Sequence, residues 1–523
     1  MPQKSEKCFY ITTPIYYVND IPHIGHAYTT IAADILARYK RLEGYQVFSL
    51  TGTDEHGQKV EKAAEDRGVD PKVHCDEMVK RFQSLWQRLA ISNNDFIRTT
   101  EIRHKKAVQK ILQDLYDRGE IYQANYQGWY CIHCERFWTE KDLTEGKCPD
   151  CLRQVSEISE KNYFFRMSKY QSWLIEHIER NERFILPPSR RNEILGFLRS
   201  PLEDLCISRP KKRLKWGIEI PFDTDYVTYV WFDALINYVS GIGFGSDGNP
   251  LSRFWPEVTH LIGKDILTTH AVYWPTMLRA IGFTPPKTVF AHGWWTIEGK
   301  KMSKSLQNVV EPNRLIDIYG ADAVRYFLMR EVPFGIDGDF SHSAMIHRIN
   351  SDLANDLGNL FSRTLSMAIK YFDGLIPTPH QVHEVDREFQ EVSETVFLQL
   401  SNQMNDLAFN KALASIWQIV GASNKYVDET APWALAKEEK DRSRLSTVLY
   451  QPLESLRLIA LLLAPFMPST SERMWSQLGI EEDLWKQNLK EDGKWGGLKP
   501  GRKVTKPVPL FPRLDPSKIS QGA

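Results

Sequence analysis

The sequence lacks the features of several specialised classes of protein. No apolar run approaches the roughly 20 residues of a transmembrane helix, and residues 1–7 contain neither an apolar signal core nor an arginine-rich amphipathic pattern. The 66 basic and 66 acidic residues give a net charge of +0, which excludes a uniformly basic nucleic-acid-binding surface. Seven cysteines, an odd number, argue against a disulfide framework. We therefore expect a cytoplasmic protein with no membrane partner.

Internal repeats and low-complexity linkers are absent too, so the chain has to form ordinary globular domains. Its 523 residues are too many for one hydrophobic core. A hydrophobic content of 42% and a charged content of 25% are typical of globular proteins. If the protein binds RNA, the basic residues that contact the RNA have to lie on one face of the protein. Residues 189–215 and the tail from 486 onwards are candidates, and a solvated charged surface is the alternative for both.

Changes of pattern along the chain divide it into four parts. Strand and helix patterns alternate in 1–118 and again in 226–345, which predicts the two halves of a Rossmann-like parallel-sheet catalytic domain. Residues 119–225 break the alternation and are interpreted as an insertion. From 346 to 523 the apolar spacing is helical only, which predicts an all-α helical bundle followed by a tail. Its helices are expected at 349–371, 384–405, 409–430, 443–464 and 469–478.

The insertion contains two closely spaced pairs of cysteines. Cys131 and Cys134 form the first pair, and Cys148 and Cys151 follow after thirteen intervening residues. Each pair can chelate an ion from a tight turn, and two such turns make a tetrahedral site of four thiolates. Such a site has no open position for a substrate. The spacing therefore predicts one structural zinc ion that holds the insertion together without taking part in chemistry.

A short motif after the first predicted strand has the arrangement of a phosphate-binding turn. His23, Gly25 and His26 belong to the sequence PHIGH at 22–26, between the apolar run 8–17 and a helical pattern over 27–42. The first N–H groups of a helix have no internal partner and lie at the positive end of its dipole. The histidines add donors, and glycine lets a nucleotide approach closely. Taken alone, the motif is better explained by two surface histidines at the start of a helix.

A second candidate residue follows the next predicted strand, at 46–50. Asp54 lies in the sequence TGTDEHG at 51–57. Ligands of doubly wound sheets bind at the carboxyl ends of the strands, so this carboxylate could hold the amino group of a substrate. The alternative is that Asp54 is a helix N-cap, a position that aspartate commonly occupies.

A lysine-rich motif far along the chain gives the PHIGH turn a partner. Lys301, Ser303 and Lys304 belong to the sequence KMSKS at 301–305, which follows a predicted strand and a glycine turn. Two ammonium groups on flexible stems suit a departing pyrophosphate. For this loop alone, a solvated turn is the better explanation. Together, the two motifs in this order and context resemble the class I aminoacyl-tRNA synthetases.

Within that class, the chain looks most like the methionyl-tRNA synthetase family over nearly its whole length. The matching stretches include YITTPIYY at 10–17, TGTDEHG, the cysteine pairs, YVWFDA at 229–234 and GKD at 263–265. The resemblance implies catalytic roles for His23, His26, Lys301 and Lys304, and an ATP site formed by these residues with Gly25, Gly263, Asp265 and Ser303. It also implies a methionine pocket formed by Ile15, Tyr17, Asp54, Trp231, Ala234, Leu235, Tyr238 and His292.

The chemistry of these residues agrees with that pocket. Aromatic faces suit the polarizable sulfur of a thioether. Trp231 and Tyr238 are seven positions apart, which would put both rings on one helical face. Packing in the core is the alternative explanation for both rings, and without the resemblance it would be preferred.

The resemblance further implies three residues that read the tRNA anticodon. Asn359 and Arg363, four positions apart, would share a helical face, and Trp433 follows a proline at a predicted helix start. Asparagine and arginine can read base edges, and an exposed tryptophan can stack on an unpaired base. Burial under the preceding helix is the alternative for Trp433.

The expected activity is therefore ligation of L-methionine to tRNA(Met) through a methionyl-adenylate, with Mg²⁺ bound to the ATP and a monomeric enzyme. Three other interpretations remain. The chain could activate leucine, isoleucine, valine or cysteine, although the short insertion and the downstream position of the cysteine pairs speak against these substrates. It could be a catalytically inactive, synthetase-like RNA-binding protein. It could also be a nucleotidyltransferase that acts on a small molecule, although such an enzyme would not need the large helical domain.

Overall fold

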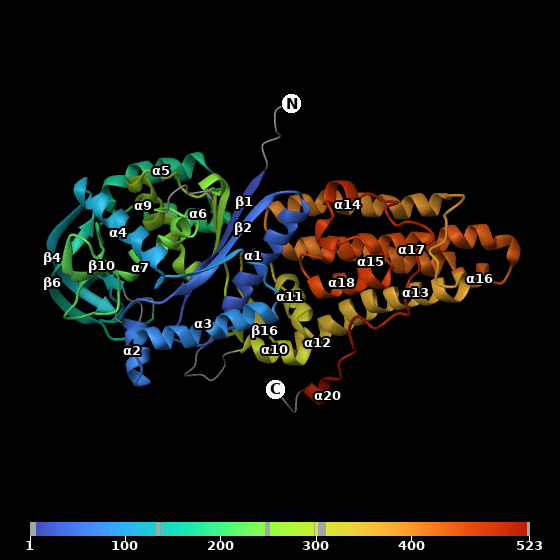
Figure 1. Ribbon diagram of the computed structural model, residues 1–523, viewed down its shortest axis with the longest axis horizontal. Helices are drawn as coiled ribbons and strands as arrows, with labels where there is room; N and C mark the ends of the chain where they lie inside the picture. The colour runs from blue at the N-terminus through green and yellow to red at the C-terminus, as the bar shows by residue number, and fades with distance from the viewer. Residues whose placement is uncertain are drawn as a thin grey trace.

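The computed structural model describes residues 7–131, 136–138, 140–149, 151–245, 252–297, 299–301 and 310–519. A parallel six-stranded sheet forms the centre of the N-terminal half, in the order β3-β2-β1-β12-β13-β7 (Figure 1). Its strands are β1 Cys8–Tyr17, β2 Gln46–Asp54, β3 Asp95–Arg98, β7 Ile185–Leu186, β12 Val258–Gly263 and β13 Thr288–His292. The strand order reverses between β1 and β12, and in open α/β sheets ligands bind at such a point.

Helices cover both faces of this sheet. One buried apolar cluster includes side chains of α1 (Ile24–Leu42) and α3 (Pro71–Arg88), and it continues into the C-terminal helices. A second cluster includes side chains of α4 (Ile102–Asp117) and α9 (Trp274–Ile281) on the other face. Short helices α2 (Gln58–Asp66), α7 (Val230–Leu235) and α8 (Asn237–Ser240) lie beyond strand ends. The predicted doubly wound domain is confirmed.

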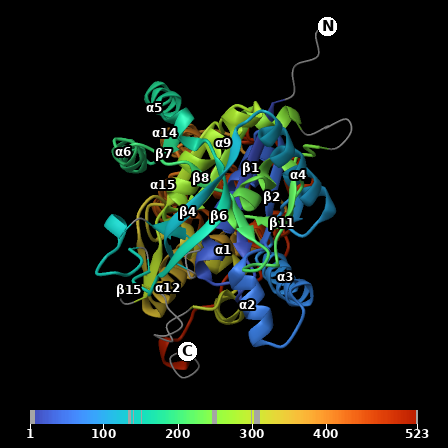
Figure 2. The same ribbon diagram turned by 90° about the vertical axis from the view of Figure 1, so that its left-hand side faces the viewer.

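The part interpreted as an insertion forms an antiparallel sheet in the order β5-β4-β6-β8 (Figure 2). Its strands are β4 Ile121–Cys131, β5 Arg136–Trp138, β6 Ser156–Phe165 and β8 Leu205–Cys206. Helices α5 (Gln171–Arg180) and α6 (Pro188–Phe197) flank β7, which pairs with β13 as the edge strand of the central sheet. The sequence pattern gave no sign of this two-residue strand. A second small sheet contains β9 Ser208–Pro210, β10 Glu219–Ile220 and β11 Asp223–Thr228.

A small sheet of β14 Trp295–Ile297, β15 Lys300–Lys301 and β16 Gly338–Phe340 connects the two halves of the molecule, together with α10 (Pro312–Tyr319), α11 (Ala321–Arg330) and α12 (His342–Arg348). The helical domain that follows consists mainly of α13 Asn359–Phe372, α14 Glu384–Asn405, α15 Phe409–Thr430, α16 Pro432–Leu435, α17 Arg442–Leu463 and α18 Pro468–Gln477. The tail ends in α20, Pro516–Ile519.

The helical ranges expected from the sequence match these elements closely, with one difference. The segment Ile349–Gly358 is a π-helix that runs into α13, where one regular helix was expected. Among the described residues, no helix is long and apolar enough to cross a membrane.

Candidate active site

The PHIGH turn forms the beginning of α1, and both histidine rings help to cap that helix. Nδ1 of His23 accepts the N–H of Gly25 at 3.1 Å, and Nδ1 of His26 accepts the N–H of His23 at 3.2 Å. The two rings stack with their centroids 3.7 Å apart. A Cβ on residue 25 would lie 3.0 Å from the His23 ring, so glycine lets this ring close over the turn.

This capping arrangement fixes the protons on the two rings. Because each Nδ1 accepts a hydrogen bond, the single proton of each neutral imidazole lies on Nε2. Burial lowers the pKa of His23, and burial together with the neighbouring His23 ring lowers the pKa of His26 well below its ordinary value. Both rings are therefore neutral at pH 7, and each carries an N–H donor at Nε2. Such donors beside a helix N-terminus suit an anionic phosphate chain.

Asp54 lies at the carboxyl end of β2, beside the end of β1. The register of the two strands pairs Tyr17 with Asp54 and Ile15 with Gly52. Asp54 is buried, with 3% of its surface exposed. The N-cap of the following helix, α2, is Gly57, so Asp54 is not a helix cap and that alternative is wrong.

A histidine that the sequence motifs did not indicate joins the aromatic residues of the candidate pocket. His270 accepts the hydroxyl proton of Tyr238 at Nε2 (2.8 Å), and its Nδ1–H donates to the carbonyl of Ile266 (2.9 Å). Burial lowers the pKa of His270 to about 4, so the ring is neutral. The Trp231 ring lies edge-on to it with centroids 6.5 Å apart. The continuous helix expected between Trp231 and Tyr238 is broken after Leu235, and the two rings converge on His270 instead.

The short helix α7 carries Trp231, Ala234 and Leu235, and a buried carboxylate anchors it. The two oxygens of Asp233 accept hydrogen bonds from His56 Nδ1 and His104 Nε2, both at 2.7 Å. Burial alone would raise the pKa of Asp233, but the two histidines lower it to about 2. Ala234 and Leu235 are themselves buried. The pocket helix is thus tied both to the residue two positions after Asp54 and to α4.

His292 lies beside α1. Its Nε2 accepts the hydroxyl proton of Thr29 at 2.6 Å, its Nδ1–H donates to the carbonyl of Gly293, and its ring packs edge-on against Tyr28. It also borders Gly263, because a Cβ built there would lie 3.9 Å from the ring. The structure therefore brings His292 to the residues predicted for the nucleotide, while His270 joins Trp231 and Tyr238.

Gly263 and Asp265 form a tight turn at the end of β12. A Cβ on Gly263 would lie 2.5 Å from a carboxylate oxygen of Asp265, and that same oxygen accepts the indole N–H of Trp294 at 3.0 Å. Lys301 ends β15. Ser303 and Lys304 lie outside the described residues, as does Cys134 of the cysteine pairs.

Three of the four predicted metal ligands converge. The Sγ atoms of Cys131, Cys148 and Cys151 all lie within 4.8 Å of one another, with Cys131 and Cys151 3.5 Å apart. Three sulfur ligands, one at the end of β4 and two from the segment before β6, fit a tetrahedral metal site, and thiolates are ligands that zinc prefers. This group can hold a metal ion.

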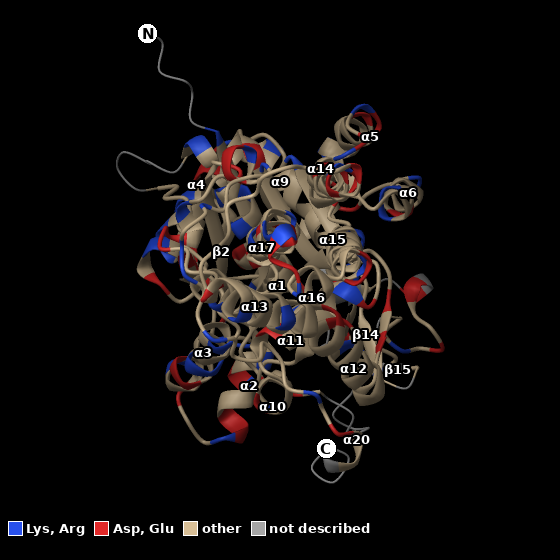
Figure 3. Cartoon of the chain, turned by 90° about the vertical axis from the view of Figure 1, so that its right-hand side faces the viewer, with Lys and Arg blue, Asp and Glu red and all other residues tan. Residues whose placement is uncertain are grey.

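The three predicted anticodon readers lie on the helical domain, whose α13 and α16 are far from the sheet (Figure 1). Asn359 is exposed at the start of α13. Arg363 forms an ion pair with Asp428 at 2.8 Å. Trp433 is 47% exposed, so its expected alternative, burial, is wrong. Viewed from this end, the positions of basic and acidic residues alternate along the ribbon (Figure 3).

Known families match both halves of the chain. A family described as tRNA synthetases class I (M) matches residues 9–159 and 153–365, and the anticodon binding domain of methionyl tRNA ligase matches residues 376–521. The methionine–tRNA ligase of Caldanaerobacter subterraneus subsp. tengcongensis is 51% identical over 516 residues, which cover 98% of this chain and 80% of that protein. The chain belongs to the methionine–tRNA ligase family.

Solved structures of this family have the same fold. Mycobacterium tuberculosis methionyl-tRNA synthetase in complex with methionyl-adenylate matches with a TM-score of 0.93 at 41% identity, covering 97% of this chain and 100% of that one. The free form of that synthetase matches with a TM-score of 0.87 at 38% identity, covering 99% and 100%. The family resemblance stated from the sequence is confirmed.

Proposed function

We propose that the chain is a methionine–tRNA ligase, which joins L-methionine to tRNA(Met) through a methionyl-adenylate and releases AMP and pyrophosphate. One observation carries this proposal. The N-terminus of α1, with two neutral histidines, follows strand β1, Asp54 ends the neighbouring strand β2, and Trp231 and Tyr238 converge on His270. A phosphate site thus lies beside a site for an amino acid with an uncharged, polarizable side chain.

The first step needs positioning more than proton transfer. The methionine carboxylate is ionised at neutral pH and attacks the α-phosphorus of ATP without a general base. Mg²⁺ bound with the ATP would supply further neutralisation of charge. The Nε2–H groups of His23 and His26 donate to phosphate oxygens, and Gly263 and Asp265 border the nucleotide. Lys301, Ser303 and Lys304 are assigned to the leaving pyrophosphate from the sequence motif alone. Catalysis is then electrostatic stabilisation and alignment.

Recognition of methionine combines a charge at one end with a neutral pocket at the other. Asp54 binds the ammonium group beside Ile15 and Tyr17. Trp231 and Tyr238 surround the thioether, with Ala234 and Leu235 behind them. Because His270 is neutral and accepts the Tyr238 hydroxyl proton, these two groups place no charge beside the thioether. His292 completes the wall between this pocket and the nucleotide.

In the second step, a ribose hydroxyl of the tRNA 3′ adenosine attacks the adenylate carbonyl. Asn359 and Arg363 read the anticodon bases, and Trp433 stacks on one of them. Its exposed indole is suited to that contact.

Cys131, Cys134, Cys148 and Cys151 would hold one structural zinc ion per chain, which closes the turn between β4 and β6. Metal analysis of the purified protein tests this assignment. One equivalent of zinc is expected, and Cys148→Ser should lose it without changing the methionine pocket. Zinc retained in full by that variant would contradict the ligand set. We also propose that the enzyme is cytoplasmic and that it is a monomer. Sedimentation at assay concentrations tests the monomeric state.

The deciding experiment is ATP–pyrophosphate exchange with each of the twenty amino acids in the absence of tRNA. Exchange with methionine alone is the expected result. Exchange with leucine, isoleucine, valine or cysteine instead would confirm a class I synthetase but contradict the assignment of the pocket to methionine. No exchange from folded, zinc-containing protein would favour a catalytically inactive RNA-binding protein.

A further inference from the structure

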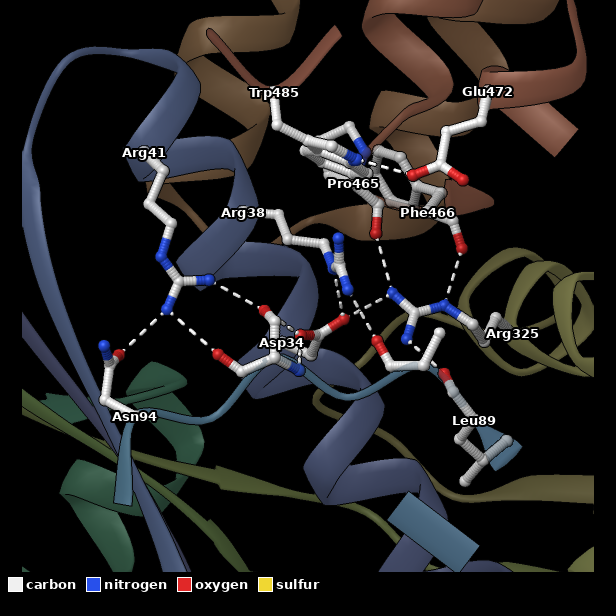
Figure 4. Close-up of polar contacts among 12 residues, drawn as sticks. Asp34, Arg38, Arg41, Leu89, Asn94, Arg325, Pro465, Phe466, Glu472 and Trp485 are labelled. Atoms are coloured by element: carbon white, nitrogen blue, oxygen red, sulfur yellow. Dashed lines mark hydrogen bonds and ion pairs between the residues drawn. The ribbon is translucent and has the colours of Figure 1, made fainter. Parts of the chain in front are cut away.

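A single buried arginine connects three other parts of the fold where the catalytic and helical domains meet (Figure 4). Arg325 lies in α11 and donates from Nε to the carbonyl of Phe466 (2.9 Å), and from Nη1 to that of Leu89 (3.0 Å). Its Nη2 donates to the Asp34 carboxylate (2.7 Å) and to the carbonyl of Pro465 (2.8 Å). The side chains of both Arg325 and Asp34 are 0% exposed. This guanidinium therefore bonds to α1, to the end of α3 and to the segment after α17.

The carboxylate partner belongs to the helix that begins with the two active-site histidines. Asp34 of α1 also accepts hydrogen bonds from Arg38 Nε (2.8 Å) and from both the N–H and the hydroxyl of Ser92 (2.7 and 2.6 Å). Burial raises the pKa of Asp34, but Arg325 and Arg38 outweigh that effect and the pKa is lowered. Asp34 is therefore ionised at neutral pH, and Arg325 holds the body of α1 by a charged hydrogen bond.

The same face of α11 also contacts the helical domain through the carboxyl group of Asp322, whose pKa is raised by burial. Asp322, one turn before Arg325, accepts the N–H of Thr470 at 2.6 Å. Thr470 lies in the first turn of α18, while Phe466 follows the C-terminus of α17. The Asp322 carboxyl group thus accepts an N–H from the first turn of α18, and the Arg325 cation lies at the negative end of α17. The corner between α17 and α18 is therefore hydrogen-bonded to α11 through both Arg325 and Asp322.

Partly exposed contacts extend this junction. The Arg38 guanidinium lies over the Trp485 ring, 4.5 Å from its centroid, and the Trp485 indole N–H donates to Glu472 at 2.6 Å (Figure 4). Arg38 therefore contacts the helical domain and Asp34 at once.

We propose that Arg325 is a positioning residue that fixes the orientation of the helical domain relative to α1, so that one tRNA can reach both the anticodon readers and the adenylate. This inference rests on the proposed function. A folded tRNA is a stiff ligand, and binding at one end raises the effective concentration of its other end only if the two protein sites keep a matching separation. Buried charge pairs add little net stability, but removing one partner leaves the other unpaired. Such a pair can therefore hold one relative orientation of the two domains.

The test is the enzyme's preference for the correct anticodon, measured as the ratio of kcat/KM for tRNA(Met) to kcat/KM for the same tRNA with an altered anticodon. Arg325→Lys keeps the positive charge but loses the planar fork of donors. We expect this ratio to fall about tenfold, because anticodon contacts no longer help to deliver the 3′ end. Methionine-dependent ATP–pyrophosphate exchange, which needs no tRNA, should stay within about twofold of the unchanged protein.

Arg457→Lys is a matched control. Arg457 is only 4% exposed, pairs with Glu454 at 2.6 Å and donates to two backbone carbonyls, but all these partners lie in the helical domain. The Arg457→Lys variant should therefore have the same anticodon preference as the unchanged protein. Should Arg325→Lys not fold, Asp34→Asn carries the test, since it keeps the shape and removes the charge facing Arg325. If the folded variant has an unchanged ratio of kcat/KM for the two tRNAs, the proposal is wrong. This holds whether both kcat/KM values fall by the same factor or neither falls. Absence of exchange in the unchanged protein would instead refute the proposed function.

Discussion

The two ends of the molecule that are proposed to face substrates hold their functional side chains in opposite ways. At the sheet, Tyr238 and His270 are buried, His26 is partly buried, and hydrogen bonds fix where their protons lie. On the helical domain, Asn359 and Trp433 are exposed on the surface of the bundle. The difference follows from the ligands. A reacting phosphate needs preorganised donors away from water, whereas unpaired bases are read by side chains that reach into solvent.

The largest expected effect comes from removing one of the preorganised donors. His26→Ala should lower methionine-dependent ATP–pyrophosphate exchange about a hundredfold, since the loss of one transition-state donor costs about 3 kcal/mol. His347→Ala, which removes an exposed histidine of α12, is the control and should have no effect. Exchange within threefold of the unchanged protein in His26→Ala would contradict the role given to this ring.

The corresponding change on the helical domain should act on tRNA alone. Trp433→Ala should lower kcat/KM for tRNA(Met) about ten- to a hundredfold, because stacking of a base on an aromatic ring contributes about 1–3 kcal/mol. Exchange without tRNA should not change. Lys437→Ala, a nearby exposed residue, is the control. If Trp433→Ala impaired exchange as well, the two ends of the molecule would not be separable as described.

Lowering the pH should reduce the stability of the protein through the buried histidine of the methionine pocket, His270, and not through the exposed residues of the helical domain. The pKa of His270 is lowered from its ordinary 6.5 to about 4, so the unfolded chain binds this proton at a higher pH than the folded protein does. The free energy of unfolding should then fall by about 1.5 kcal/mol from this group as the pH drops from about 6.5 to 5. Denaturant unfolding at the two pH values measures it. His270→Gln should show a smaller loss, and an equal loss would exclude His270 as a source of the pH dependence.

The smallest effect is expected from an exposed ion pair that joins the two parts of the molecule. Arg183 and Asp406 are 3.0 Å apart, and their side chains are 60% and 62% exposed. Asp406→Asn should change the free energy of unfolding by less than about 0.5 kcal/mol, since solvent and salt screen such pairs. A loss above about 2 kcal/mol would show that this contact, and not only the buried Arg325 junction, holds the domains together.

Local patterns in the sequence predicted the fold well where they reflected one hydrophobic period. The first strand was expected at 8–17 and is found there, and the helices at 384–405 and 409–430 have the expected bounds. The π-helix at Ile349–Gly358 was missed because its apolar spacing resembles that of an α-helix. The two-residue strand β7 was missed because its pairing with β13, about a hundred residues later, leaves no local pattern.

The candidate site divides in the same way. By itself the sequence determined the PHIGH turn, the cysteine pairs and the position of Asp54 at a strand end, because each depends on spacing within a few residues or on the end of one element. Only the tertiary structure decided that His270 meets Trp231 and Tyr238, that Asp233 bridges two histidines, and that Arg325 joins α1 to the helical domain. These contacts join residues far apart in the chain, and burial and hydrogen-bond geometry, which spacing does not encode, select them.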